Sequence, residues 1–171
     1  IDPSSINKNV KVDLPIVGDV TEVITSTIKT IKKVKPNFAK SNKQKISKWW
    51  EKIQKWRSIN SFDFVNSTET IKPQYAVQRL YELTKNKDTY ITTEVGQHQM
   101  WAAQHYKFDK PNRWMTSGGL GTMGYGLPAA VGVQVAHPNK LVIDIAGEAS
   151  VLMTMQEMST AVQYSLTIKI F

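Results

Sequence analysis

Apolar residues in the second half of the chain follow two periods, one typical of strands and one typical of helices. The strand-like runs read TYITTEV at 89–95, LVIDIA at 141–146 and LTIKIF at 166–171. In the segments between them, apolar residues recur three and four positions apart, as on one face of a helix. These helices are expected to begin near Pro73, Gln97, Pro128 and Met153. Strands that alternate with helices predict an α/β fold with a parallel sheet and right-handed crossovers.

The start of the chain shows a shorter version of the same pattern. The run LPIVGDV at 14–20 predicts a strand that ends at Gly18-Asp19. Asp19 is a residue type that caps the N-termini of helices, and the apolar spacing after it predicts a helix over about 20–33. Pro36 is expected to end this region, because proline cannot continue a helix without losing a hydrogen bond.

A basic connector, residues 35–70, separates the two parts. It contains a predicted amphipathic helix whose apolar face carries Ile46, Trp49, Trp50, Ile53 and Trp56. Most of the net charge of +8 belongs here, with eleven Lys and Arg between Lys29 and Arg57 against one acid, Glu51. One interpretation is a basic nucleic-acid surface. We favour an interdomain helix that docks its Trp face on a neighbour, because the aromatic residues lie on the apolar stripe rather than among the lysines.

Composition excludes several classes of protein. Hydrophobic residues make up 41% of the chain, enough for a real core, and the absence of cysteine excludes disulfides and thiolate metal sites. There is no run of about 18 apolar residues and no signal peptide, so we expect a soluble, cytoplasmic protein without a membrane span. Because the sequence starts without Met and ends in a strand-like run, we expect it to be a fragment of a longer protein.

Three polar or glycine-rich corners follow the predicted strands. They read VGQH at 95–98, GGLGTMGYG at 118–126 and GEAS at 147–150. GEAS offers backbone N–H groups, a hydroxyl and a carboxylate, which suit a diphosphate held through a divalent metal. Taken singly, the corners have ordinary explanations: a turn for GEAS, core packing for Met123 and a structural histidine for His98. Together they predict one site, because parallel sheets bind ligands at the carboxyl ends of their strands.

Long stretches of the sequence resemble one enzyme family. They are GQHQMWAAQ at 96–104, WMTSGGLGTMGYGLPAAVG at 114–132 and DIAGEASVLMTMQEMSTAVQY at 144–164. These stretches are similar to the C-terminal domain of thiamine-diphosphate enzymes, and above all to the catalytic (large) subunit of acetohydroxyacid synthase, also called acetolactate synthase. The resemblance implies that 71–171 is the first half of the parallel-sheet thiamine-diphosphate-binding domain. Residues 1–34 resemble the end of the family's central, FAD-binding α/β domain, and 35–70 connect the two.

The resemblance also implies a cofactor site. The residues that it assigns to thiamine diphosphate are Val95, Gly96, Gln97, His98, Gly121, Met123, Gly147, Glu148, Ala149 and Ser150. A backbone carbonyl near Gly121 is expected to hold the aminopyrimidine, and Met123 to wedge the two cofactor rings into a V. Glu148 is the expected Mg²⁺ ligand, although the family usually has Asp there, so the corner must shift or the coordination loosen. The second metal ligand, an Asn in the family, is expected beyond Phe171.

A second cofactor, FAD, is implied for the first part of the chain. The residues that match FAD-lining positions of the family are Ile1, Asp2, Ile6, Gly18, Asp19 and Val20. Asp19 also has a structural explanation, as the cap of the helix that follows it. The implied role of FAD is structural, because the main reaction involves no net redox change.

The implied reaction is the decarboxylation of pyruvate and its condensation with a second pyruvate or with 2-oxobutyrate, in the biosynthesis of valine, leucine and isoleucine. No catalytic residue is expected in this chain, because in the family the glutamate that activates the cofactor comes from the N-terminal domain of a partner subunit. The fragment alone is therefore expected to be inactive. The implied partners are further catalytic subunits, in a homodimer or tetramer, and a small regulatory subunit, with no nucleic acid and no membrane.

Two other functions are open on the sequence alone. One is another thiamine-diphosphate enzyme of the pyruvate oxidase or glyoxylate carboligase type, against which the wording QHQMWAAQ and TMGYGLPAA argues. The other is a non-enzymatic, basic RNA-binding module built on residues 29–57. Steeply salt-dependent affinity for nucleic acid would support this module. No base-stacking or recognition motif is visible in the sequence, which argues against this module, and we therefore expect the synthase.

Overall fold

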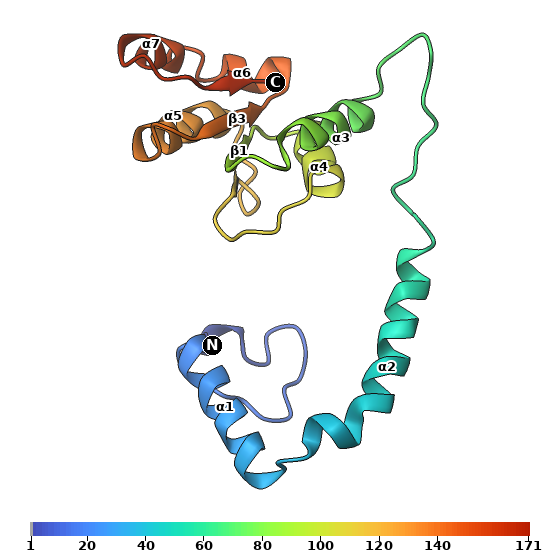
Figure 1. Ribbon diagram of the computed structural model, residues 1–171. Coiled ribbons are helices and arrows are strands. Elements are labelled where there is room, and N and C mark those ends of the chain that lie inside the picture. Colours follow the sequence, from blue (N-terminus) through green and yellow to red (C-terminus); the bar gives the residue numbers. More distant parts are fainter. Residues whose placement is uncertain (1) are drawn as a thin grey trace. The chain divides into compact units, whose positions relative to one another are not determined.

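The computed structural model describes residues 2–171 and divides into two units, Ile1–Ser61 and Phe62–Phe171 (Figure 1). The first unit holds a short 3-10 turn, η1 (Pro3–Ser5), and two helices, α1 (Val20–Val34) and α2 (Phe38–Arg57). The second unit holds the sheet and the remaining helices. The border between the units falls inside the segment 35–70 that the sequence predicts as a connector.

α1 begins where its capping chemistry predicts. The carboxylate of Asp19 accepts hydrogen bonds from the backbone N–H groups of Thr21 at 2.9 Å and Glu22 at 3.2 Å, which are otherwise without partners in the first turn. The prediction of a strand at 14–18 is wrong, since the described part of the first unit contains no strand. The run therefore has no neighbouring strand with which to pair. A strand without a neighbour leaves its backbone groups unpaired, so this run is irregular and its apolar side chains are exposed.

α2 confirms the predicted amphipathic helix and extends it at its N-terminal end. Trp49 and Trp56 meet edge to face, with ring centroids 5.7 Å apart. The Nζ atom of Lys52 lies 5.6 Å from the Trp49 centroid and 5.0 Å from that of Trp56. One lysine therefore does lie among the aromatic residues, as a cation–π partner. Both Trp side chains are half exposed within this unit, so docking of this face stays a prediction.

The second unit is built on a four-stranded parallel sheet, which confirms the predicted fold class. Its strands are β1 (Thr89–Thr93), β2 (Trp114–Thr116), β3 (Leu141–Ile145) and β4 (Lys169–Ile170), in the order β2-β1-β3-β4. The central pair, β1 and β3, is aligned along its whole length, from Thr89 opposite Leu141 to Thr93 opposite Ile145. The two strands therefore end side by side. β4 is shorter than the predicted run 166–171.

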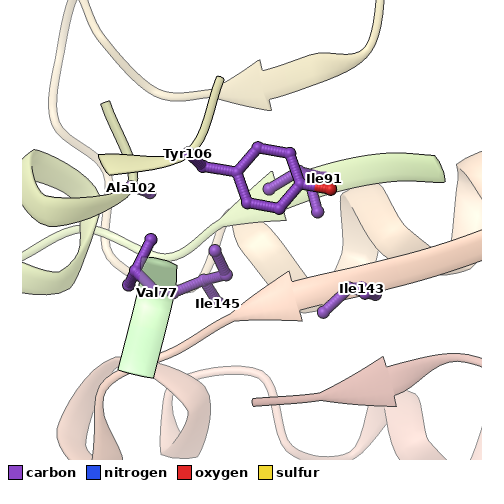
Figure 2. Close-up of a cluster of buried hydrophobic side chains, with 6 residues drawn as sticks. All are labelled: Val77, Ile91, Ala102, Tyr106, Ile143 and Ile145. Carbon is purple, nitrogen blue, oxygen red and sulfur yellow. The ribbon is translucent and has the colours of Figure 1, made fainter. Parts of the chain in front are cut away.

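Helices cover both faces of this sheet. α3 (Pro73–Thr84) and α4 (Gln97–His105) pack on one face, where Val77 and Ala102 meet Ile91, Ile143 and Ile145 (Figure 2). α5 (Gly126–Ala136) packs on the other face through Ala130, against Tyr90 and Val142. Neighbouring residues of one strand thus serve opposite faces, as the two-residue period of a strand requires. This burial on both faces explains why the strands read as almost continuous apolar runs.

The predicted helix over 153–164 is wrong in its bounds. The structure has α6 (Glu148–Leu152), a stretch of turns, and α7 (Glu157–Gln163). In the turns, backbone N–H groups bond three residues back, as from Thr154 to Val151 O and from Glu157 to Thr154 O. The Thr154 hydroxyl also donates to Gly124 O at 3.1 Å, so contact with the glycine-rich loop interrupts the helix.

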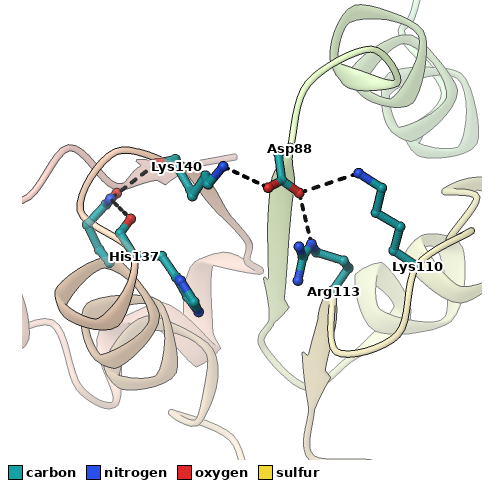
Figure 3. A network of polar contacts seen from close by, with 6 residues as sticks. Asp88, Lys110, Arg113, His137 and Lys140 are labelled. Atoms are coloured by element: carbon teal, nitrogen blue, oxygen red, sulfur yellow. Dashed lines mark hydrogen bonds and ion pairs between the residues drawn. The ribbon is translucent and has the colours of Figure 1, made fainter.

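A charged cluster joins the segments that lead into three strands (Figure 3). Asp88 precedes β1 and accepts from Lys140 Nζ at 2.9 Å and from Arg113 Nε at 3.0 Å, and Lys110 Nζ lies 3.8 Å away. The Lys140 and Arg113 hydrogen bonds hold the pKa of Asp88 down at about 2, against the opposing effect of desolvation. The cluster lies at the amino ends of the strands, opposite the edge where the predicted site lies.

Within residues 2–171, no helix is long and apolar enough to cross a membrane.

Candidate functional site

One cavity of about 430 Å³ opens at the carboxyl ends of β1 and β3. Because Thr93 and Ile145 are opposite each other, the segments that follow the two strands are neighbours. They meet the glycine-rich loop before α5 at this edge. The lining residues are Val95, Gly96, Gln97, His98, Trp101, Met123, Ala146, Gly147, Glu148, Ala149 and Ser150. This is the edge at which parallel sheets bind ligands.

Of the positions predicted for thiamine diphosphate, all but Gly121 line this cavity. Gly121 lines an adjacent cavity of about 380 Å³ with Gln99, Thr116 and the loop 117–120. Its φ of +66° is in the left-handed region, where glycine avoids the strain that a side chain would bring. Trp101 and Ala146 are lining residues that the sequence did not single out. The structure thus brings the predicted residues together, and their contact with a cofactor stays a prediction.

Two glycines make room for the ring of His98. A Cβ atom on Gly96 would stand 2.7 Å from His98 Cε1, and one on Gly147 would stand 2.8 Å from the same atom. Burial lowers the pKa of His98, with a backbone hydrogen bond at Glu94 acting in the opposite direction. Its Nε2 atom is buried and has no hydrogen-bond partner within the described chain. A neutral, unsatisfied imidazole nitrogen in the wall of a cavity can accept or donate to a polar ligand.

The corner after β3 is the first turn of α6 rather than an open loop. Gly147 is its N-cap, and Ser150 is buried with its hydroxyl donating to Gly147 O at 3.0 Å. That hydroxyl keeps its oxygen as an acceptor, and the first N–H groups of the helix have no acceptor within it. The Glu148 side chain is exposed. The described residues contain no group of three or more His, Asp or Glu placed to hold a metal.

Sequence reasoning missed Glu94, which follows β1 directly. Its side chain is fully buried, and its carboxylate accepts from Gly124 N at 2.7 Å and from Leu127 N at 3.1 Å. It thereby ties the end of β1 to the glycine-rich loop and to the first turn of α5. The sequence did contain a sign of this role, because Glu94 is an acid at the end of an apolar strand, just before Gly96. Burial of a carboxylate there costs free energy unless hydrogen bonds compensate it.

Sequence reasoning also missed Asp144 as a polar group inside the sheet. It is fully buried, Thr92 Oγ1 donates to its Oδ1 at 2.8 Å, and Oδ2 has no partner within residues 2–171. Burial raises the pKa of Asp144 to about 6, despite the opposing Thr92 hydrogen bond. A Cβ atom at residue 126 would collide with Asp144 Oδ1, so Gly126 allows α5 to begin this close to the sheet.

The positions predicted for FAD are less concentrated. Ile1 lies outside the described residues, Asp2 caps η1, and Asp19 and Val20 begin α1. Ile6 lies at the C-terminal end of η1. A cavity of about 450 Å³ in this unit is lined by Gly18, neighbouring residues 16 and 17, and one side of α1, without the other predicted positions.

Comparison with known proteins shows which proteins the chain resembles. Residues 94–171 match the family described as thiamine pyrophosphate enzyme, C-terminal TPP binding domain. The chain is 48% identical to the acetolactate synthase large subunit of Buchnera aphidicola subsp. Schizaphis graminum, over 99% of this chain and 28% of the relative. It is 46% identical to the acetolactate synthase isozyme 3 large subunit of Escherichia coli K12, over 98% of this chain and 29% of the relative. Over almost its whole length, the chain is therefore similar to acetolactate synthase large subunits.

This similarity confirms the resemblance seen in the three sequence stretches, and the match of residues 94–171 confirms a domain of the thiamine-pyrophosphate-binding type. The chain spans less than a third of the length of these relatives. A benzoylformate decarboxylase structure from Polynucleobacter necessarius agrees in fold, with a TM-score of 0.53 and 23% identity over 63% of this chain and 21% of that one. The shared fold is what this likeness establishes.

Proposed function

We propose that this chain is part of an acetolactate synthase, which decarboxylates pyruvate and joins the two-carbon unit to a second pyruvate or to 2-oxobutyrate. The observation that carries the proposal is one cavity at the ends of β1 and β3, which is lined by 95–98, Met123 and 147–150. The identity of 48% to an acetolactate synthase large subunit supports this choice among thiamine-dependent reactions.

The lining residues fit thiamine diphosphate. Thiamine diphosphate, when bound, supplies the carbon atom that carries the two-carbon unit. Gly147, Ala149 and Ser150 offer small side chains and backbone N–H groups to a diphosphate. Neutral His98 offers its unsatisfied nitrogen without adding charge. Met123, which is 41% exposed beside the cavity, offers an apolar side chain that can exclude water from the rings of the cofactor.

We further propose that Mg²⁺ is held between Glu148 and the diphosphate. One carboxylate is consistent with the way Mg²⁺ binds, through one or two carboxylates, phosphate oxygens and waters. Glu148→Asp, which restores the acid usual in the family, tests the role. We expect a changed Mg²⁺ dependence of thiamine diphosphate binding, measured by calorimetry at several metal concentrations. An identical dependence in both proteins would remove Glu148 from the site.

We also propose FAD as a second cofactor, a cytoplasmic location and partner subunits, as the resemblance implies. FAD is expected as a structural cofactor at Asp2, Ile6 and Gly18–Val20, in a protein of the cytoplasm. The partners are further catalytic subunits, which supply the activating glutamate, and a small regulatory subunit. Supporting the FAD proposal, Gly18 lines a cavity beside α1 that is large enough for part of a ligand. FAD release on denaturation, detected by its absorbance, tests this part separately.

The decisive experiment is an activity assay on the protein expressed at the full length of its gene. Acetolactate formed from pyruvate, and acetohydroxybutyrate formed with 2-oxobutyrate present, are the expected products. Assays for acetyl phosphate with oxygen uptake, and for tartronate semialdehyde from glyoxylate, serve as controls for the oxidase and carboligase reactions. Activity in a control assay without acetolactate formation would overturn the proposal.

A further inference from the structure

The glycine-rich loop that carries Met123 has little structure of its own. Residues 117–125 form bends and a turn, and Leu120 within them is 94% exposed. Met123 nevertheless lines the cavity at the ends of β1 and β3. A flexible side chain on an irregular loop holds a fixed place only if the neighbouring backbone is anchored.

One anchor is the carboxylate of Glu94. Its Oε2 atom accepts from the N–H of Gly124, the residue directly after Met123, at 2.7 Å. Its Oε1 atom accepts from the N–H of Leu127, in the first turn of α5, at 3.1 Å. α5 has no side-chain cap of its own at Tyr125, so this carboxylate takes the place of a cap. Hydrogen bonds from backbone N–H to a carboxylate are among the stronger ones.

Glu94 is itself held rigidly. Its side chain is fully buried, and its backbone N–H donates to Ile145 O at 3.0 Å, which joins it to β3. The carboxylate therefore connects the rigid centre of the sheet to the loop. A change of length or hydrogen-bonding capacity at this residue passes directly to residue 124, because a packed interior leaves little room for compensation.

The second anchor is on the other side of the same residue. The Thr154 hydroxyl donates to Gly124 O at 3.1 Å. Gly124 has a φ of +88°, and a Cβ atom there would stand 3.0 Å from both Met153 Cβ and Thr154 Cγ2. The N–H and the C=O of residue 124 are thus held by two different elements, and this fixes the direction from which Met123 enters the cavity.

We propose that Glu94 is a positioning residue that sets the place of Met123 in the cavity, with Thr154 as its counterpart. The inference rests on the proposed function for the identity of the ligand, and not for the contacts themselves. Glu94 itself does not touch the cofactor. Its effect on a bound ligand passes through the peptide between Met123 and Gly124.

The first test is Glu94→Gln in the protein expressed at the full length of its gene, with Glu69→Gln as the control. Glu69 is exposed in the same unit, so it controls for the loss of one carboxylate. An amide keeps one acceptor oxygen but presents an NH₂ group to the second N–H. Hydrogen exchange followed by mass spectrometry should show faster exchange over 118–127 in Glu94→Gln, with β1 and β3 as protected as in the wild type.

The second readout is the bound cofactor. Thiamine diphosphate affinity should fall about tenfold in Glu94→Gln, as expected for one lost hydrogen bond to a carboxylate. At saturating cofactor, the near-ultraviolet circular dichroism of the bound thiamine should still differ from that of the wild type. In a Met123→Ala background, Glu94→Gln should have a much smaller effect, because both changes act through one side chain. Equal effects in both backgrounds, or an unchanged dichroism at saturation, would overturn the inference.

Two results distinguish a failure of the role of Glu94 from a failure of the proposed function and from unfolding of the variant. If the wild-type protein binds no thiamine diphosphate, the proposed function fails, and unchanged exchange over 118–127 in Glu94→Gln would still refute the role of Glu94. If Glu94→Gln loses protection in β1 and β3, Thr154→Val decides, with Thr154→Ser as its hydroxyl-bearing control. Faster exchange over 118–127 and altered dichroism in Thr154→Val alone support the anchored loop. Equal behaviour of the two Thr154 variants rejects it.

Discussion

Gly147 and Gly132 are both glycines in the second unit, and only their surroundings tell them apart. A Cβ on Gly147 would stand 2.8 Å from the His98 ring, whereas one on Gly132 in α5 would meet nothing within 4 Å. We expect Gly147→Ala to displace the ring and weaken thiamine diphosphate binding about tenfold, or roughly 1.4 kcal/mol. Gly132→Ala, the matched control, should bind normally. Calorimetric titration measures both, and equal affinities would contradict the role given to Gly147.

Asp144 gives the fold a dependence on pH. Its pKa is raised by burial from 3.8 to about 6, so it contributes stability that is fully present below about pH 4 and is lost as pH rises through 6. The free energy of unfolding should fall by about 2–3 kcal/mol over this range from this residue. Asp144→Asn should remove that fall and be the more stable protein at pH 8. Urea unfolding at pH 4, 6 and 8 tests this, and parallel profiles for both proteins would contradict it.

At the scale of elements, β1, β3, β4 and most helix starts could be predicted because their signals are local. Asp19 caps α1 with its own side chain, and the helix predicted to begin at Gln97 does begin there. The wrong predictions were those that depend on distant partners. The run 14–18 has strand-forming residues without a neighbouring strand, and Thr154 breaks the predicted helix through its contact with Gly124.

The Asp88 cluster is another feature of elements that only their assembly creates, since its cations come from segments before β2 and β3. We expect Asp88→Asn to lower the melting temperature of the protein at neutral pH. The pKa of Asp88 is lowered to about 2, so its contribution is present above about pH 4 and is lost as pH falls toward 2. The difference between variant and wild type in thermal unfolding should shrink over that range. A constant difference would assign the effect to packing.

At the scale of the whole molecule, most of the positive charge and the candidate cavity belong to different units. The basic residues gather on α1 and α2 in the first unit, while the cavity lies in the second. If the activating glutamate comes from elsewhere, residues 1–171 alone should form no acetolactate from pyruvate with added cofactors. The full-length gene product, assayed beside it, is the positive control. Clear turnover by residues 1–171 would show that the chemistry needs no further domain.

The basic helices offer a second test at this scale. If α2 docks its Trp face within a protein, nucleic-acid binding by the full-length protein should be weak and without sequence preference. Fluorescence anisotropy with a labelled RNA at rising salt measures this. Tight binding with a steep loss of affinity as salt increases would instead favour the nucleic-acid interpretation of residues 29–57.

The sequence alone determined the parallel α/β fold, the resemblance to acetolactate synthases and the three corners of the site, because alternating periods and long motifs are properties of neighbouring residues. It also predicted that the corners would meet, since parallel strands end on one edge. Only the tertiary structure decided which residues hold those corners in place. Glu94 reaches Gly124 across thirty positions of sequence, and His98 needs the absence of side chains at Gly96 and Gly147. Such constraints depend on distances in space, which no local pattern records.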